Sequence, residues 1–197
     1  MGRKILLINA CVRKGSRTKI LADRLLAKLG QPYEEVYLND MHFPIVDEEF
    51  LKKRDRLIAE NAFGDPLFDE ARKFAEAETN VIAAPYWDLS FPASLKQYIE
   101  QINVLGITFK YTDDGYPAGL CRAKKLFYVT TAGGCYVPEE FGFGYVKALA
   151  QNFYGIQDVV KIEAAGLDIY GADADAIMEA AERSVTDMDL YGDIPEE

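Results

Sequence analysis

The chain has 197 residues, 49% of them hydrophobic, and its formal net charge is -10 at pH 7. This length and composition predict one globular domain, residues 1–197, with a sizeable core, and they exclude a disordered chain. The acidic charge argues against nucleic acid or an anionic membrane as a partner, because both attract basic surfaces.

Cysteine usage and hydropathy indicate the compartment. Cys11, Cys121 and Cys135 are an odd number without metal-type spacing, which is typical of reduced thiols and predicts a cytoplasmic protein without a metal site. The first apolar run is too short for a secretory signal, and no run reaches transmembrane length, so we expect no membrane partner.

Apolar runs and helical periodicities alternate along the chain. The expected strands cover residues 4–10, 33–38, 80–85, 125–131 and 158–165. The expected helices cover residues 18–29, 47–77 with a break near 64–66, 92–103, 139–154 and 173–188. This alternation predicts an α/β protein with a doubly wound parallel sheet and right-handed crossovers. Five such strands fit the order 2-1-3-4-5, whose ligand crevice lies where strands 1 and 3 diverge.

The loop after the first strand, residues 10–19, places hydroxyl side chains at the start of a helix. It contains neither GxxxxGK[ST] nor GxGxxG, so nucleoside triphosphate and Rossmann-type dinucleotide binding lose their usual support. The free N–H groups and positive dipole end of a helix suit a phosphate, to which Ser16 and Thr18 would add donors. The alternative is that Ser16 only caps the helix. Lys19 favours the phosphate, because a cation in the first turn opposes the helix dipole unless an anion is bound.

A bulky aromatic pair follows the third strand. Tyr86 and Trp87, together with Leu89, can form an apolar slot at the carboxyl end of a strand, where open α/β sheets bind ligands. Pro92 then opens an amphipathic helix. The alternative is that both aromatic rings are ordinary core residues.

Two further segments have the composition of a binding site. Gly133 and Gly134, after the fourth strand, let the backbone approach a ligand closely and direct N–H groups toward it, although a plain strand-to-helix turn has the same composition. Residues 106–119 form an excursion that the sheet does not need. Residues 108–112 alternate like a short strand, and the aromatic content of the excursion disfavours disorder.

The chain lacks the residue sets of hydrolytic catalysis. It offers no Ser-His-Asp set, no paired histidine ligands and no acid–base dyad, and its one histidine, His42, is expected to be a loop residue. We therefore expect no catalytic side chain, and a bound cofactor that carries the chemistry.

The runs APYWDLSFPASLKQYI (residues 84–99) and GITFKY (residues 106–111), with matching segments near residues 15–19, 131–136 and 152–160, resemble one family. They are similar to the FMN-dependent NAD(P)H quinone and azo-compound reductases. The resemblance implies a flavodoxin-like three-layer sandwich with a five-stranded parallel sheet in the order 2-1-3-4-5. It also implies a homodimer that passes two electrons from NADH or NADPH to quinones, azo compounds or similar flat aromatic acceptors. In that family the mechanism is ping-pong: the nicotinamide gives a hydride to flavin N5 and leaves before the acceptor enters.

The resemblance also implies site residues. In the family, the positions that match Ser16, Arg17 and Thr18 hold the FMN phosphate. The other positions that it places at the cofactor are Pro85, Tyr86, Trp87, Asp88, Leu89, Thr131, Gly133, Gly134 and Tyr136. Phe109 and Phe153 are candidates to cover the partner subunit's flavin in the substrate pocket, the alternative being plain interface or core packing.

Asp88 departs from the family, which usually has Asn at this position. An amide both donates and accepts, whereas an ionised carboxylate only accepts. Either Asp88 points away or is protonated by burial, or its charge stays close and lowers the reduction potential of the flavin. The second outcome is a hypothesis that only the substitution motivates.

Two other functions stay open. The acidic charge also suits a flavodoxin-type FMN electron carrier that docks basic partners without oxidising nicotinamide. The length and the excursion at residues 106–119 favour the reductase. A cofactor-free binding or hydrolytic protein of the same fold is the third possibility, because fold alone does not determine function.

Overall fold

A five-stranded parallel sheet forms the centre of the computed structural model, which describes residues 5–190. The strand order is β2-β1-β3-β6-β7, which is the predicted order 2-1-3-4-5 with two short strands numbered in between. The strands are β1 (Ile5–Asn9), β2 (Tyr33–Tyr37), β3 (Thr79–Ala83), β6 (Lys125–Thr131) and β7 (Asp158–Ala164). Lys4, expected in the first strand, lies outside the described residues.

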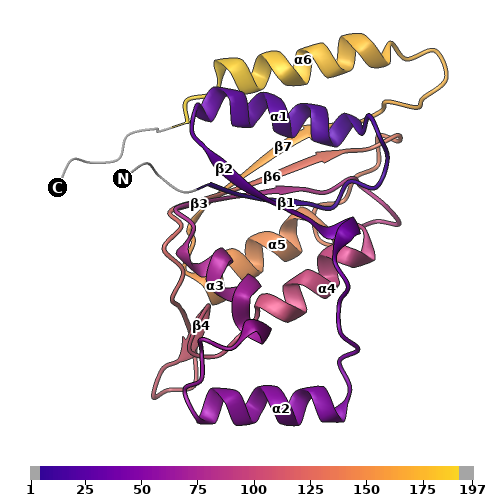
Figure 1. Ribbon diagram of the computed structural model, residues 1–197. Helices are drawn as coiled ribbons and strands as arrows, with labels where there is room; N and C mark the ends of the chain where they lie inside the picture. Colours follow the sequence, from indigo (N-terminus) through magenta and orange to yellow (C-terminus); the bar gives the residue numbers. More distant parts are fainter. Residues whose placement is uncertain (1–4, 191–197) are drawn as a thin grey trace.

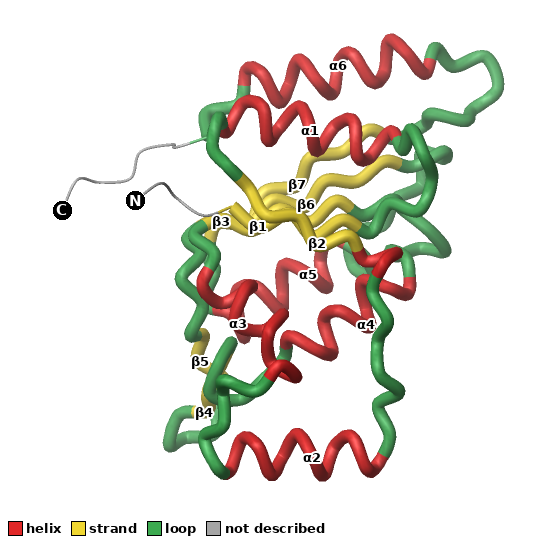
Figure 2. Tube along the Cα trace, viewed as in Figure 1, coloured by secondary structure: helices red, strands yellow, loops and turns green. Residues whose placement is uncertain are grey.

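Helices cover both faces of the sheet (Figure 1). One face carries α1 (Arg17–Leu29) and α6 (Ala174–Asp187), which lie side by side. The other face carries α3 (Asp69–Glu76), α4 (Ala93–Ile102) and α5 (Phe143–Leu149) (Figure 2). The predicted three-layer sandwich is therefore confirmed.

The apolar run of β1 supplies both halves of the core. Ile5 and Leu7 pack in the cluster under α1 and α6, whereas Leu6 and Ile8 pack in the cluster on the opposite face. Successive side chains of a strand point to opposite faces, so a strand covered on both sides has to be apolar throughout.

The charged segment at residues 47–77 is broken where the sequence predicted. It forms α2 (Glu48–Ala59), the 3-10 turn η2 (Pro66–Phe68) and α3, and another 3-10 turn, η1 (Leu38–Asp40), follows β2. The carboxylate of Asp47 accepts a hydrogen bond from Phe50 N at 2.9 Å and so caps α2. In Figures 1 and 2, α2 stands apart from the sheet.

The helix predicted over residues 139–154 is partly wrong. Its first turn is irregular, and α5 begins only at Phe143 because the preceding Gly142 has a non-helical backbone, with φ -116° and ψ -89°. A π-helical turn, η3 (Ala150–Tyr154), continues α5 to the end of the predicted range.

The excursion at residues 106–119 is an ordered antiparallel hairpin of β4 (Phe109–Tyr111) and β5 (Pro117–Gly119). The buried hydroxyl of Thr108 anchors it by donating to Ile102 O at 2.7 Å. No helix among residues 5–190 is long and apolar enough to cross a membrane.

Candidate functional site

A cleft of about 440 Å³ opens at the carboxyl edge of the sheet. Three segments of the chain that the sequence singled out converge there, at residues 12–18, 85–87 and 131–133, together with residues 167–168. Backbone hydrogen bonds extend the strand pairing into these segments: Tyr86 N donates to Thr131 O at 3.0 Å, and Ala132 N donates to Ala164 O at 2.9 Å. The walls of the cleft are therefore held by the sheet itself.

The hydroxyl of Ser16 is not committed to its helix. Ser16 is the N-cap residue of α1, but its side chain makes no capping hydrogen bond, and no acidic residue lies in the first turn. The alternative in which Ser16 only caps α1 is therefore not what the structure shows. The N-terminus of α1 lines the cleft, with a hydroxyl that does not cap the helix, an arrangement that suits a phosphate.

Thr18 and Thr131 connect two of the converging segments. Their hydroxyl oxygens lie 2.6 Å apart, and both residues are buried at the base of the cleft. The hydrogen bond joins the first turn of α1 to the end of β6, which are 113 positions apart in sequence.

Lys19 has partners that weaken the charge argument made from the sequence. Its Nζ donates to Asp23 Oδ1 at 2.5 Å, four residues along the same helix. Desolvation disfavours the charged amine, but the hydrogen bond and charge of Asp23, with Glu35 nearby, outweigh it and raise the pKa of Lys19. Asp23 thus supplies a negative charge that the sequence argument assigned to a bound anion.

Asp168 lines the cleft, and sequence reasoning missed it. Its Oδ1 lies 2.8 Å from Nη1 of Arg17, a predicted phosphate ligand, in an exposed ion pair across the cleft. A Cβ on Gly133 would lie 2.4 Å from Asp168 Oδ2, so this position favours glycine. The one signal for Asp168 was its place just after the last strand, at the sheet edge where ligands bind.

A tight turn presents the aromatic segment. Trp87 and Ser90 exchange two backbone hydrogen bonds, and Asp88 and Leu89 between them have φ of 50° and 69°. This is the geometry of a type I′ turn, which Asp tolerates and which strains Leu. Trp87 is 40% exposed, which excludes the alternative of a core residue.

The structure does not bring every predicted residue into the cleft. Pro85, Tyr86, Trp87, Thr131 and Gly133 line it with the residues of the first loop. The others lie beyond its walls: Asp88, Leu89, Gly134 and Tyr136.

Phe109 and Phe153 pack against each other, with ring centroids 5.1 Å apart, and neither lines the cleft of its own chain. Phe109 is buried, which favours the packing alternative within one chain. A role toward a partner subunit stays a prediction for both residues.

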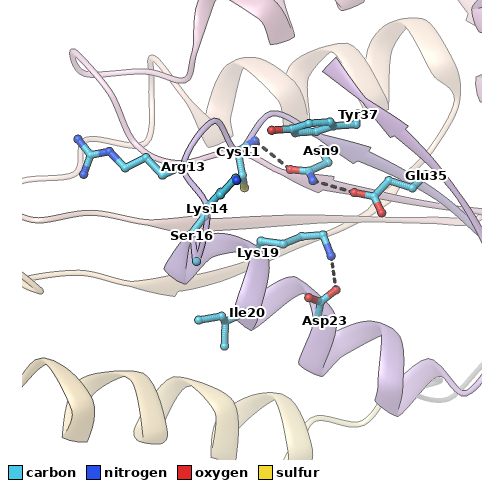
Figure 3. Close-up of a pocket in the computed structure, with 11 residues that line it drawn as sticks. Asn9, Cys11, Arg13, Lys14, Ser16, Lys19, Ile20, Asp23, Glu35 and Tyr37 are labelled. Carbon is cyan, nitrogen blue, oxygen red and sulfur yellow. Dashed lines mark hydrogen bonds and ion pairs between the residues drawn. The ribbon is translucent and has the colours of Figure 1, made fainter. Parts of the chain in front are cut away.

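A second cavity, of about 500 Å³, lies on the other side of the loop at residues 13–16 (Figure 3). Asn9 spans its floor: Nδ2 donates to Glu35 Oε1 at 2.7 Å, and Oδ1 accepts from Cys11 N at 2.9 Å. Burial raises the pKa of the Cys11 thiol, although a hydrogen bond with Ser16 partly offsets this. A thiol of raised pKa is a poor nucleophile.

The residues described here contain no group of three or more His, Cys, Asp or Glu side chains that could hold a metal ion. His42 lies in the loop between η1 and α2, as expected. The cleft is thus a phosphate-compatible, aromatic-walled site lined by backbone, hydroxyl, aromatic and charged groups, three of the charged groups being basic: Arg13, Lys14 and Arg17.

The chain matches, over residues 3–187, a family model described as a flavodoxin-like fold. It is 37% identical over 185 residues to an FMN-dependent NADH:quinone oxidoreductase of Clostridium beijerinckii, covering 88% of this chain and 90% of that protein. A protein of the same name from Lachnoclostridium phytofermentans is 37% identical over 198 residues, covering 92% and 96%.

Solved structures share the fold. An azoreductase from Bacillus anthracis superposes with a TM-score of 0.81 at 24% identity, covering 93% of this chain and 96% of that one. An FMN-dependent NADH-azoreductase from the same species, solved in complex with FMN, superposes with a TM-score of 0.77 at 24% identity, covering 93% and 95%.

Proposed function

The chain belongs to the family of flavodoxin-like proteins that includes the curated FMN-dependent NADH:quinone oxidoreductases, and from this premise we propose its reaction. It is an FMN-dependent oxidoreductase that takes two electrons from NADH or NADPH. It passes them to quinones, azo compounds or similar flat aromatic acceptors by a ping-pong mechanism. The cleft at the carboxyl edge of the sheet carries this proposal, because it joins a phosphate-compatible helix terminus to an aromatic wall.

The residues of the cleft fit FMN. Ser16 has a hydroxyl that does not cap its helix at the N-terminus of α1, where a phosphate would receive backbone N–H donors. Arg17 provides a cation at the same end, and Gly133 exposes its backbone to the cleft without a side chain. Bound FMN would supply the two-electron redox chemistry that the side chains of this chain lack.

The side chains of this chain bind the cofactor and the substrates, orient them and shield them from water. Tyr86 and Trp87 offer apolar surface to a flat acceptor or to the nicotinamide, and their position at a strand end holds them rigidly. A single aromatic wall would serve the reductant and the acceptor in turn, which supports the ping-pong order.

We further propose a cytoplasmic homodimer. Large aromatic side chains are exposed on the β4–β5 hairpin and on the loop after β6: Tyr111, Tyr116, Tyr136 and Phe141 are 54% to 76% exposed. A second copy of the chain would cover such apolar surface. Cys11, Cys121 and Cys135 are all free thiols, which suits a reducing compartment.

The hypothesis that the charge of Asp88 lowers the reduction potential of the flavin still needs a test. Asp88 is exposed at the tip of the turn and does not line the cleft. A charge held near the reduced flavin would lower its reduction potential, and equal midpoint potentials for the protein and its Asp88→Asn variant would refute this effect. Asn and Asp both tolerate the left-handed backbone, so the substitution tests charge alone.

The experiment that tests the function is an FMN titration of the apoprotein, followed by NADH and NADPH oxidation with a small quinone as acceptor. We expect tight binding, flavin-dependent turnover and parallel lines in double-reciprocal plots. Binding without nicotinamide oxidation would favour an electron carrier. No binding would refute the assignment of Ser16, Arg17 and Thr18 to a phosphate.

A further inference from the structure

A small cavity adjoins the cleft. Its volume is about 10 Å³, and it is lined by side chains from the ends of β6 and β7 and from the segment at residues 137–143. Tyr86 is the one residue that lines both this cavity and the cleft. Tyr86 is therefore shared by the two spaces.

Three residues that line this cavity each carry a buried polar atom without a hydrogen-bond partner. These atoms are Tyr86 Oη, Thr130 Oγ1 and Glu163 Oε2, and they are three of the six such side-chain atoms found among the described residues. Burying one polar atom unpaired costs about 1–3 kcal/mol, so three around one space are unlike ordinary packing.

Neighbouring groups do not satisfy these atoms. Lys161 Nζ lies 3.4 Å from Glu163 Oε2 in an ion pair, longer than the usual hydrogen bond of about 2.7–3.2 Å, and this oxygen has no partner with hydrogen-bond geometry. Burial raises the pKa of Tyr128, and the side chain of Thr130, within hydrogen-bonding reach of the Tyr128 hydroxyl, partly offsets this. Thr130 Oγ1 nevertheless lacks a partner with hydrogen-bond geometry.

The sheet fixes the positions of all three residues. Thr130 and Glu163 are direct register partners on the neighbouring strands β6 and β7. Tyr86 is held against β6 by its backbone hydrogen bond to Thr131 O. The three polar atoms are thus brought together by the most rigid part of the fold.

We propose that this cavity is a specific site for one buried water molecule, bound by Tyr86, Thr130 and Glu163, through which the Tyr86 hydroxyl positions the ring that forms the flavin wall. The volume is about the least that admits one water, and such waters make two to four hydrogen bonds. The water accepts from the Tyr86 hydroxyl and donates to Thr130 Oγ1 and Glu163 Oε2, so every lone atom is paired.

Tyr86 is well suited to its part in this arrangement. Desolvation, with the nearby Tyr136, raises the pKa of Tyr86, so the hydroxyl keeps its proton and donates it in the hydrogen bond. The hydroxyl is the one polar group of the Tyr86 side chain, and the water binds it on the side of the ring that faces the small cavity. Tyr86 is thus a positioning residue, and its effect on FMN rests on the proposed function.

The affinity for FMN tests the positioning role. Thr130 lines the cavity but not the cleft, so Thr130→Val changes FMN binding only through the water and Tyr86. We expect Tyr86→Phe and Thr130→Val each to raise the Kd of FMN about fivefold, the equivalent of one hydrogen bond of about 1 kcal/mol. The double variant is expected to stay near fivefold, because both substitutions remove the same water.

Two controls accompany the cycle. Thr130→Ser keeps the hydroxyl and is expected to retain the unaltered affinity. Tyr33→Phe removes the hydroxyl of an exposed tyrosine at the amino end of β2, away from the cleft, and is also expected to leave the affinity unchanged. Unchanged FMN affinity in Thr130→Val, or a double variant near the product of about twenty-five-fold, would overturn the positioning role.

A high-resolution crystal structure of the unaltered holoprotein tests the water itself. We expect one density peak within about 2.6–3.2 Å of Tyr86 Oη, Thr130 Oγ1 and Glu163 Oε2. An empty cavity, or a direct hydrogen bond between two of these side chains, would overturn the site. If the unaltered protein bound no FMN, the proposed function would fail, and a crystal structure of the apoprotein would still decide the water site.

Discussion

The hydrogen bond between Thr18 and Thr131 offers a test of how the cleft is held together. The two hydroxyl oxygens lie 2.6 Å apart, Thr18 is fully buried and Thr131 is 9% exposed. Thr18→Val keeps the shape of the side chain but leaves the hydroxyl of Thr131 buried without this partner. The reciprocal variant Thr131→Val does the same to Thr18.

The structure sets the expected magnitude. An unpaired buried hydroxyl costs about 1–3 kcal/mol, so each single variant should lower the free energy of unfolding by about 2 kcal/mol. In a protein of this size that corresponds to a fall in Tm of about 4–8 °C. Replacing both hydroxyls leaves no unpaired group, so the double variant should lose no more than either single variant.

Denaturant unfolding of the apoprotein is the appropriate assay, because it separates stability from cofactor binding. The midpoint should fall at an unchanged m-value in both single variants. The coupling energy of the cycle, about 2 kcal/mol, is the quantity of interest. Losses that simply add in the double variant would show that the two hydroxyls do not depend on each other, and would refute the link between α1 and β6.

Three further predictions concern single positions. Gly119→Ala should destabilise the protein by about 2 kcal/mol or more, because the new Cβ would lie 2.1 Å from the backbone at the end of η3. Gly64→Ala should be tolerated, because no atom lies within 4 Å of its Cβ position. Equal Tm values for the two variants would contradict this prediction. Ser16→Ala should weaken FMN binding and change the free energy of unfolding of the apoprotein by no more than about 0.5 kcal/mol. Asp47→Ala, which removes a side chain that caps α2, should lower that free energy by about 1 kcal/mol. An equal loss of stability in the two variants would show that Ser16 is a cap. The hydrogen bond and the charge of Lys161 lower the pKa of Glu139. The ion pair therefore stabilises the folded protein fully above the ordinary pKa of 4.5, and this stabilisation is lost as the pH falls through the lowered pKa. Glu139→Gln should therefore flatten the acid limb of an unfolding profile, and an unchanged limb would refute the pair.

Local pattern was sufficient to predict the layers of this protein. The apolar run of β1, the helical spacing in α1 and α4 and the break near residues 64–66 each depend on residues close in sequence. The same holds for the three loops at the sheet edge, because the carboxyl ends of parallel strands must meet on one side. The resemblance then assigned these loops to a flavin.

Backbone geometry decided details that composition left open. The late start of α5 follows from the conformation of Gly142, and the left-handed turn at Asp88 and Leu89 follows from the hydrogen bonds that Trp87 and Ser90 exchange. Gly, Asp and Leu do not require these conformations, so the sequence pattern could not predict them.

The sequence by itself determined the fold class and the edge of the sheet that holds the cleft, because periodicity and chain order are local properties. The strand order came from the fit of five strands to a doubly wound sheet and from the resemblance. Only the tertiary structure decided which side chains face each other there. Arg17 meets Asp168 across 151 positions and Thr18 meets Thr131 across 113. Tyr86, Thr130 and Glu163 share a cavity because three strand ends converge on it. Such contacts depend on register and packing, which no short stretch of the chain contains.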